Sequence, residues 1–337
     1  MRQSATISLH VDNLVPNAGD NESSWILSVW EGANTLLKDV EFNCEDPYRS
    51  ALAQYRVSAN LDSAVALLQK ARDDAGSFSH YLQQAQQPGG SGTGAVLHFD
   101  FSAVQGNLEL YSVYNAVGTF VHQLVLALNI AFPGSCELMG TRYEGENAER
   151  FEAPQFNSSL FTNAWLSAFD AEWPQLKPLR FRAVWDWLKA RRTSETDVAM
   201  ADINKVLFGL LAIASHRHAL SSRDGILVAH LIELLMKVPD GNRHLVRERV
   251  VAVLGQPGRR ADSFNELYRL KESLLRGDYP VHRPALIVHE ADDPILQQLE
   301  MHNSPVEQGA AIVLALIQDL VDHNAGEYRF TQQISRD

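Results

Sequence analysis

The stretch Leu267–Pro284, which reads LYRLKESLLRGDYPVHRP, places two cations and a histidine close together in the sequence. Lys271 and Arg276 carry positive charges that suit phosphate groups, and His282 brings an imidazole whose ordinary pKa lies near neutrality. Metal-independent cleavage of RNA requires a cation facing the phosphate and a group that transfers protons. Lys271 and Arg276 could therefore contact a phosphate, and His282 could transfer a proton.

The same cations also have a structural interpretation. Leucines 267, 270 and 274 recur at helical spacing, and Gly277 stands where the cap of that helix is expected. Arg276 follows Glu272 by four residues, which is the spacing of an intrahelical ion pair, and a cation near a helix C-terminus complements the helix dipole. Both interpretations stay open on spacing alone.

The C-terminal half of the chain resembles the Apea-like branch of the HEPN superfamily, helical proteins that include bacterial antiviral ribonucleases. The resemblance lies in three segments, namely HLIELLM (His230–Met236), VRERVVAVLG (Val246–Gly255) and LYRLKESLLRG (Leu267–Gly277). The phrase LVLALNIAFPG resembles a segment that often precedes these helices, which extends the likeness back to about residue 120.

The family motif is an arginine, four further residues, and then histidine and glycine. The matching positions here are Lys271, Arg276 and Gly277, so the histidine in register is absent. Arg276 followed by His282, with five residues between them, fits the looser spacing of the superfamily. Arg223 and His230, with six residues between them, fit it too.

Two functions follow from the resemblance. The first is a metal-independent ribonuclease effector of bacterial antiphage defence, with Arg276, His282 and Lys271 in the catalytic site. The second is a HEPN-like subunit of a defence complex that has lost catalysis and binds RNA or protein. In either case the cations expected to contact RNA are Arg269, Lys271, Arg276 and Arg283. The family habit of composite sites implies a homodimer, and a partner protein from a defence system is compatible with both functions.

The charge of the chain is unevenly distributed. The chain has 337 residues and a formal net charge of −12, with 29 basic against 41 acidic residues. Residues 177–283 hold 19 of the basic and 12 of the acidic residues, a net charge of +7, which leaves −19 for the remainder. A basic segment in an acidic protein suits a surface that contacts phosphates, although solvated helix faces would give the same count.

Composition also limits the class of protein. The chain has no run of about eighteen apolar residues, and its polar start lacks the features of a signal peptide, so we expect a cytoplasmic protein without a membrane segment. Cys44 and Cys136 form no CxxC pair, and His216 and His218 cannot share one helix face. We therefore expect no disulfide framework, no metal site and no cofactor.

The N-terminal region, residues 1–145, has the patterns of an α+β domain. Apolar residues alternate or run together at Ile7–Val11, Ser24–Trp30 and Val40–Cys44, which predicts strands. Residues 46–87 are expected to be helical and residues 86–94 to form a glycine-rich connector. A hairpin is predicted from residues 97–101 and 108–113, with His98 and Asp100 on one solvated face of its first strand.

Beyond a polar linker the pattern changes to helical repeats. Residues 155–325 are expected to form an all-α, HEPN-like helical bundle, followed by a polar tail at residues 326–337. Trp173, Trp185 and Trp187 favour core packing over stacking on RNA bases. The apolar stripe in Val306–Val321 is expected to pack in its own bundle or against a partner.

Overall fold

The computed structural model describes the chain in nine stretches and divides it into two compact units. The described residues are 3–14, 23–46, 51–75, 94–104, 108–215, 222–238, 241–258, 264–279 and 294–331, without the side chains of 74–75 and 294–302. Unit 1 contains residues 1–162, 177–200 and 210–219, and unit 2 contains residues 163–176, 201–209 and 220–337. Unit 1 therefore includes two stretches that lie within the range expected for the helical bundle.

Unit 1 is built on a five-stranded sheet in the order β2-β3-β4-β1-β5, with every neighbouring pair antiparallel. The strands are β1 (Ser4–Val11), β2 (Val40–Asp46), β3 (Ala51–Asn60), β4 (Ala95–Ala103) and β5 (Arg142–Glu144). Alternate residues of each long strand are buried, as Ile7, Leu9 and Val11 are in β1. Because successive side chains of a strand point to opposite faces, one face of the sheet is apolar and the other is polar.

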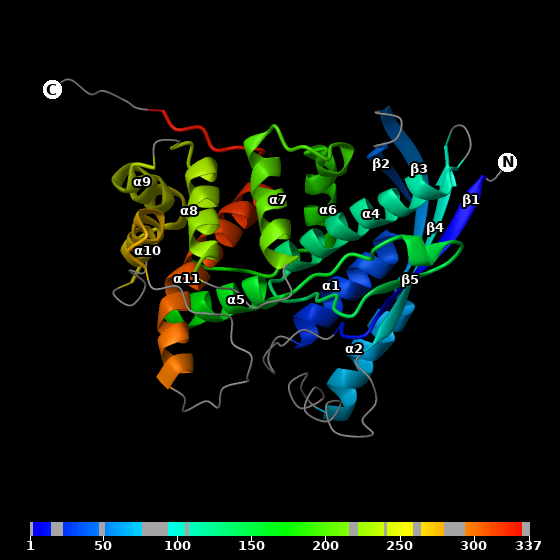
Figure 1. The fold of residues 1–337 in the computed structure, drawn as a ribbon, viewed down its shortest axis with the longest axis horizontal. Coiled ribbons are helices and arrows are strands. Elements are labelled where there is room, and N and C mark those ends of the chain that lie inside the picture. Colours follow the sequence, from blue (N-terminus) through cyan, green and yellow to red (C-terminus); the bar gives the residue numbers. More distant parts are fainter. Residues whose placement is uncertain are drawn as a thin grey trace. The chain divides into compact units, whose positions relative to one another are not determined.

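Helices α1 (Ser23–Leu36), α2 (Asp62–Ala75) and α4 (Leu110–Ala131) pack along the apolar face of this sheet (Figure 1). The ring of Phe120 in α4 lies at the centre of the core, 5.1 Å from Phe42 and 5.7 Å from Phe99 between ring centroids. Helix α6 (Phe181–Ala190) adds Trp185, whose ring lies 5.4 Å from that of Phe120. Two single turns complete the unit, η2 (Ala148–Arg150) and η3 (Thr193–Glu195).

Two of the predicted elements in this region were wrong, and the helix predicted at residues 46–87 was wrong in part, because it contains strand β3 as well as helix α2. Residues 24–30 lie in helix α1, because the residues that must be buried, Ile26, Leu27, Trp30 and Ala33, recur every three or four positions. Residues 51–60 form strand β3 rather than helix, since pairing with both β2 and β4 overrides their helical propensity. Residues 110–113 begin helix α4 and do not complete a hairpin with β4. The strands predicted at residues 7–11, 40–44 and 97–101 are confirmed.

After β5, every regular element among the described residues is helical. Helices α5 (Ser159–Ala171) and α7 (Asp202–Ala214) each contribute residues to both units. Unit 2 adds α8 (Asp224–Leu235), α9 (Arg243–Leu254), α10 (Phe264–Arg276) and α11 (Pro294–Asp322). The coarse prediction of an α+β region followed by helices is confirmed.

Helix α11 forms the core of unit 2 and packs against α8, α9 and α10. The side chains of the predicted stripe, Ile312, Leu316 and Leu320, are at most 1% exposed. The stripe therefore packs in its own bundle, which is the first of the two expected arrangements. Residues 110–131 and 303–322 are long and apolar enough to span a membrane, but 78% and 83% of these windows are buried inside the protein. Their apolar side chains therefore belong to the two cores.

Helix α10 ends as its sequence predicts. Gly277 has a positive φ of 77°, a conformation that glycine adopts without the steric cost of a Cβ. Its N–H donates to the carbonyl of Leu274, and the N–H of Asp278 donates to the carbonyl of Ser273. These two bonds satisfy carbonyls that the helix end would leave open and place the chain after Arg276 in a Schellman turn.

Candidate functional site

The candidate site lies where helices α8 and α10 of unit 2 pack side by side. The ammonium nitrogen of Lys271 lies 2.6 Å from Oε1 of Glu233 and donates a hydrogen bond to it. The Lys271 side chain is 18% exposed and that of Glu233 is 5% exposed. Because both charges are largely removed from water, each is held in place by the other.

The imidazole of His230 and the ring of Tyr268 lie next to this ion pair. His230, one helical turn before Glu233, has its Nδ1 3.9 Å from Oε2 of the same carboxylate, and its side chain is 55% exposed. The ring of Tyr268 lies beneath Lys271, with 5.7 Å between the ammonium and the ring centroid. Burial and the negative charge of Glu233 raise the pKa of Tyr268, so its hydroxyl stays protonated at neutral pH. The cluster thus joins a cation, a carboxylate and an accessible histidine.

The turn at Gly241 lies against the same ion pair. A Cβ added at this position would lie 3.3 Å from Oε1 of Glu233 and 3.8 Å from Nζ of Lys271. The positive φ of 63° at Gly241 also favours glycine. Close approach of backbone on this side helps to explain why the carboxylate of Glu233 is so little exposed.

The other predicted residues are placed differently. Arg276 is 66% exposed, and its Nε lies 3.3 Å from a carboxylate oxygen of Asp278. Arg269 is also exposed on α10. His282 and Arg283 lie outside the described residues. The structure therefore separates Lys271, which is engaged in the bundle, from Arg276 and Arg269, which face solvent.

Glu233 is the residue that the sequence patterns did not identify as part of a site. The signal was present, because Glu233 is the one acidic residue in the segment HLIELLM, which is otherwise apolar after His230. His230 precedes Glu233 by three positions on the same helix face. Only the packing of α8 on α10 shows that this carboxylate meets Lys271.

The remaining candidates have structural partners. His98 contacts the hydroxyl of Ser8 at 2.8 Å, and the hydroxyl of Thr6 donates to Asp100, all on the exposed face of the sheet. This agrees with the expected solvated face. Trp173, Trp185 and Trp187 are at most 5% exposed, which confirms core packing and leaves no ring surface for RNA bases.

Both cysteines lie in the described part of the chain. Cys44 and Cys136 are buried free thiols. Burial, with Asp197 and Asp46 nearby, raises the pKa of Cys44 to about 12, which disfavours the reactive thiolate. Among the described residues, no three histidine, cysteine, aspartate or glutamate side chains gather to hold a metal ion.

Comparison with known proteins returned no match, whether to protein-family models, to curated proteins or to solved structures.

Proposed function

We propose that this chain is a HEPN-like, RNA-binding subunit of a defence complex that does not cleave RNA through Lys271 and Arg276. The observation that carries the proposal is the 2.6 Å ion pair between Lys271 and Glu233. A lysine paired with a buried carboxylate holds two helices together. The carboxylate compensates the positive charge, which is then less available to stabilise a phosphate in a transition state.

The residue at the other motif position, Arg276, is equally unsuited to proton transfer. Arg276 occupies the place of the family histidine, and an arginine does not lose its proton at any pH at which a protein is folded. Arg276 is nevertheless well placed for a ground-state contact, because it is exposed at the end of α10. A guanidinium there binds phosphate in a bidentate manner without taking part in chemistry.

The RNA-binding surface that we propose is the exposed side of α10 that carries Arg269 and Arg276. These two residues are seven positions apart, which is close to two full helical turns, so they share one side of the helix. They belong to the only long stretch of the chain with a net positive charge, residues 177–283. Electrostatic contacts of this kind supply most of the affinity of proteins that bind nucleic acid without sequence preference.

Binding of a labelled single-stranded RNA, followed by fluorescence anisotropy at several salt concentrations, tests the proposal. The R269A/R276A double variant should bind about tenfold more weakly at low salt and show a shallower salt dependence, since two phosphate contacts are lost. Arg329, which is 86% exposed outside α10, gives the matched control R329A. Equal RNA affinity in both variants would contradict the proposed surface and favour a protein partner instead.

A second function, metal-independent RNA cleavage, is favoured by the position of His230. A carboxylate that hydrogen-bonds to an imidazole can orient it for proton transfer, and Nδ1 of His230 lies 3.9 Å from Oε2 of Glu233, just beyond hydrogen-bond distance. Incubation of the pure protein with total RNA in EDTA, read on a denaturing gel, separates the two functions. An intact RNA ladder supports the binding protein, whereas cleavage supports the nuclease.

If cleavage is seen, two histidine variants locate the acid or base. H282A should abolish cleavage and leave RNA binding nearly intact if the looser spacing of Arg276 and His282 forms the site. H230A should do so if the cluster with Glu233 forms it. Activity that survives both substitutions would exclude either histidine from proton transfer.

A further inference from the structure

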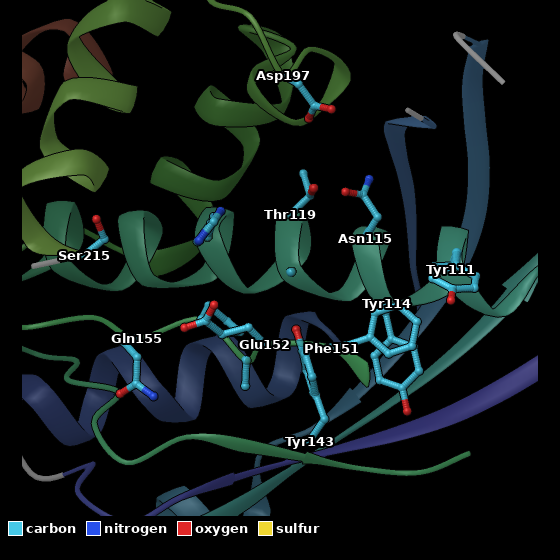
Figure 2. A pocket seen from close by; sticks show the side chains of 14 residues that line it. Tyr111, Tyr114, Asn115, Thr119, Tyr143, Phe151, Glu152, Gln155, Asp197 and Ser215 are labelled. Carbon is cyan, nitrogen blue, oxygen red and sulfur yellow. The ribbon is translucent and has the colours of Figure 1, made fainter. Parts of the chain in front are cut away.

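A groove of about 600 Å³ lies in unit 1, and none of the residues that line it belongs to unit 2. Its floor is one side of helix α4, where Tyr111, Asn115, Gly118 and His122 recur every three or four positions and Thr119 lies beside Gly118. Figure 2 shows Asp197 on one side of this helix and Glu152 on the other. The volume is in the range of sites for small molecules.

One end of the groove is a rigid aromatic wall. The rings of Tyr114 and Phe151 are stacked, with 4.0 Å between centroids and an interplanar angle of 13°. Tyr111 packs edge-on against the same Phe151 at 5.0 Å, and Tyr143 packs against Tyr114 at 5.1 Å. Tyr111 is 46% exposed, so part of its ring is open to an incoming group. Rings that hold one another in this way form a surface that exists before any ligand arrives.

The charged groups of the groove are all acidic at neutral pH. Glu152 and Asp197 line it, and both are exposed, whereas no lysine or arginine stands among the described residues that line it. Partial desolvation and, less strongly, the negative charge of Glu45 raise the pKa of Asp197, so Glu45 adds to the negative field at this carboxylate. His122 also lines the groove with an exposed side chain, and partial desolvation lowers its pKa, which favours the neutral imidazole.

Gly118 keeps the middle of the floor open. A glycine inside a helix costs about 1 kcal/mol relative to alanine, so it is an unfavourable choice for the helix itself. A Cβ at this position would meet only the hydroxyl of Tyr143, at 3.8 Å, so packing of the protein does not require the glycine. Its lack of a side chain leaves the space above α4 free.

We infer that this groove binds a small organic cation in which an ammonium group is joined to a planar ring. The ring stacks or packs edge-on at the wall formed by Tyr111 and Phe151, and the ammonium pairs with Glu152 or Asp197. Aromatic faces and carboxylates both attract a positive charge, and they do so more strongly in a partly desolvated groove than in water. The same negative field excludes phosphates and carboxylates. This inference does not depend on RNA binding by α10.

Three probes of nearly identical shape test the role of charge. Calorimetric titration of the full chain with phenethylamine should give saturable binding. Its neutral analogue 2-phenylethanol should bind at least tenfold more weakly, and its anionic analogue phenylacetate should give no signal. Equal binding of the cation and the neutral alcohol would overturn the inference, as would preference for the anion or binding of none of the three.

Variants of the protein test the location. The E152Q/D197N double variant should lose at least tenfold in phenethylamine affinity, because both carboxylates are neutralised with little change of shape. Glu41, an exposed acid on β2 that does not line the groove, gives the matched control E41Q, which should bind as the unmodified chain does. G118L should fill the floor and abolish binding, with folding confirmed by an unchanged thermal midpoint. Binding unaffected by E152Q/D197N would contradict the assigned site even if G118L fails to fold.

Discussion

Lys271 and Glu233 form an ion pair of 2.6 Å between two helices of unit 2, and only 5% of the glutamate side chain is exposed. In the HEPN resemblance that we propose, Lys271 would occupy the position of the family arginine. The contact shows that this position serves the packing of α10 on α8.

Loss of one partner of this pair should be strongly destabilising. K271M leaves the carboxylate of Glu233 buried without a countercharge, and we expect it to lower the free energy of unfolding by about 3 kcal/mol or more. The double variant E233L/K271M, which removes both charges, should recover most of that loss. Urea denaturation measures both. K205M is the control, since Lys205 is 43% exposed in its pair with Asp202 and should lose less than about 1 kcal/mol. If K271M and K205M lower the free energy of unfolding by similar amounts, the buried pair stabilises the fold no more than an exposed pair does.

Gly309 should not tolerate a side chain. A Cβ there would lie 2.7 Å from Cδ2 of Leu267 and 2.8 Å from Cγ1 of Val228, both fully buried. We expect G309A to lower the free energy of unfolding by about 1–2 kcal/mol, because the packed core must shift to admit the methyl group. Gly258, with nothing within 4 Å of an added Cβ, provides G258A as a control of unchanged stability. If G309A is as stable as G258A, the prediction is wrong, because α11 then accommodates the added methyl group with no loss of unfolding free energy.

The ion pairs of Lys237 should make the stability of unit 2 sensitive to acid. Its ammonium lies 2.8 Å from Asp202 and 3.2 Å from Glu327, and these contacts hold the pKa of both carboxyls below their ordinary values of 3.8 and 4.5. A carboxyl with a lowered pKa in the folded state stabilises the fold above its ordinary pKa, and this contribution disappears as the pH falls through the lowered value. The difference in unfolding free energy between the unmodified chain and K237M should therefore be largest near pH 7 and shrink below about pH 4. A difference that is constant with pH would contradict the assignment.

The homodimer stays a prediction, and exposed apolar side chains on α5 provide one face at which to test it. The apolar stripe of α11 is used inside its own bundle, but Leu166 and Phe169 on α5 are 45% and 72% exposed. If two chains associate through this face, light scattering at micromolar concentration should give about twice the 37.6 kDa of one chain, and F169D should return it to the monomer. The control is V198D, since Val198 is 70% exposed outside α5. A monomeric unmodified chain would remove the basis for a composite site.

The sequence by itself determined the features that depend on local periodicity and turn chemistry. Alternation of buried residues identified β1 and β4, and the leucines that precede Gly277 identified α10 and its end. These patterns are strong because each residue is buried, or placed at a turn, by the geometry of its own segment.

Tertiary structure decided the features that depend on a neighbour distant in sequence. Residues 51–60 became a strand because β2 and β4 offer hydrogen bonds on both sides, and Lys271 became structural because Glu233 lies opposite it on another helix. The groove on α4 needs Phe151, Glu152 and Asp197 from segments that no local pattern connects to that helix. Spacing along the chain does not encode such contacts, since they arise only when separate elements pack together.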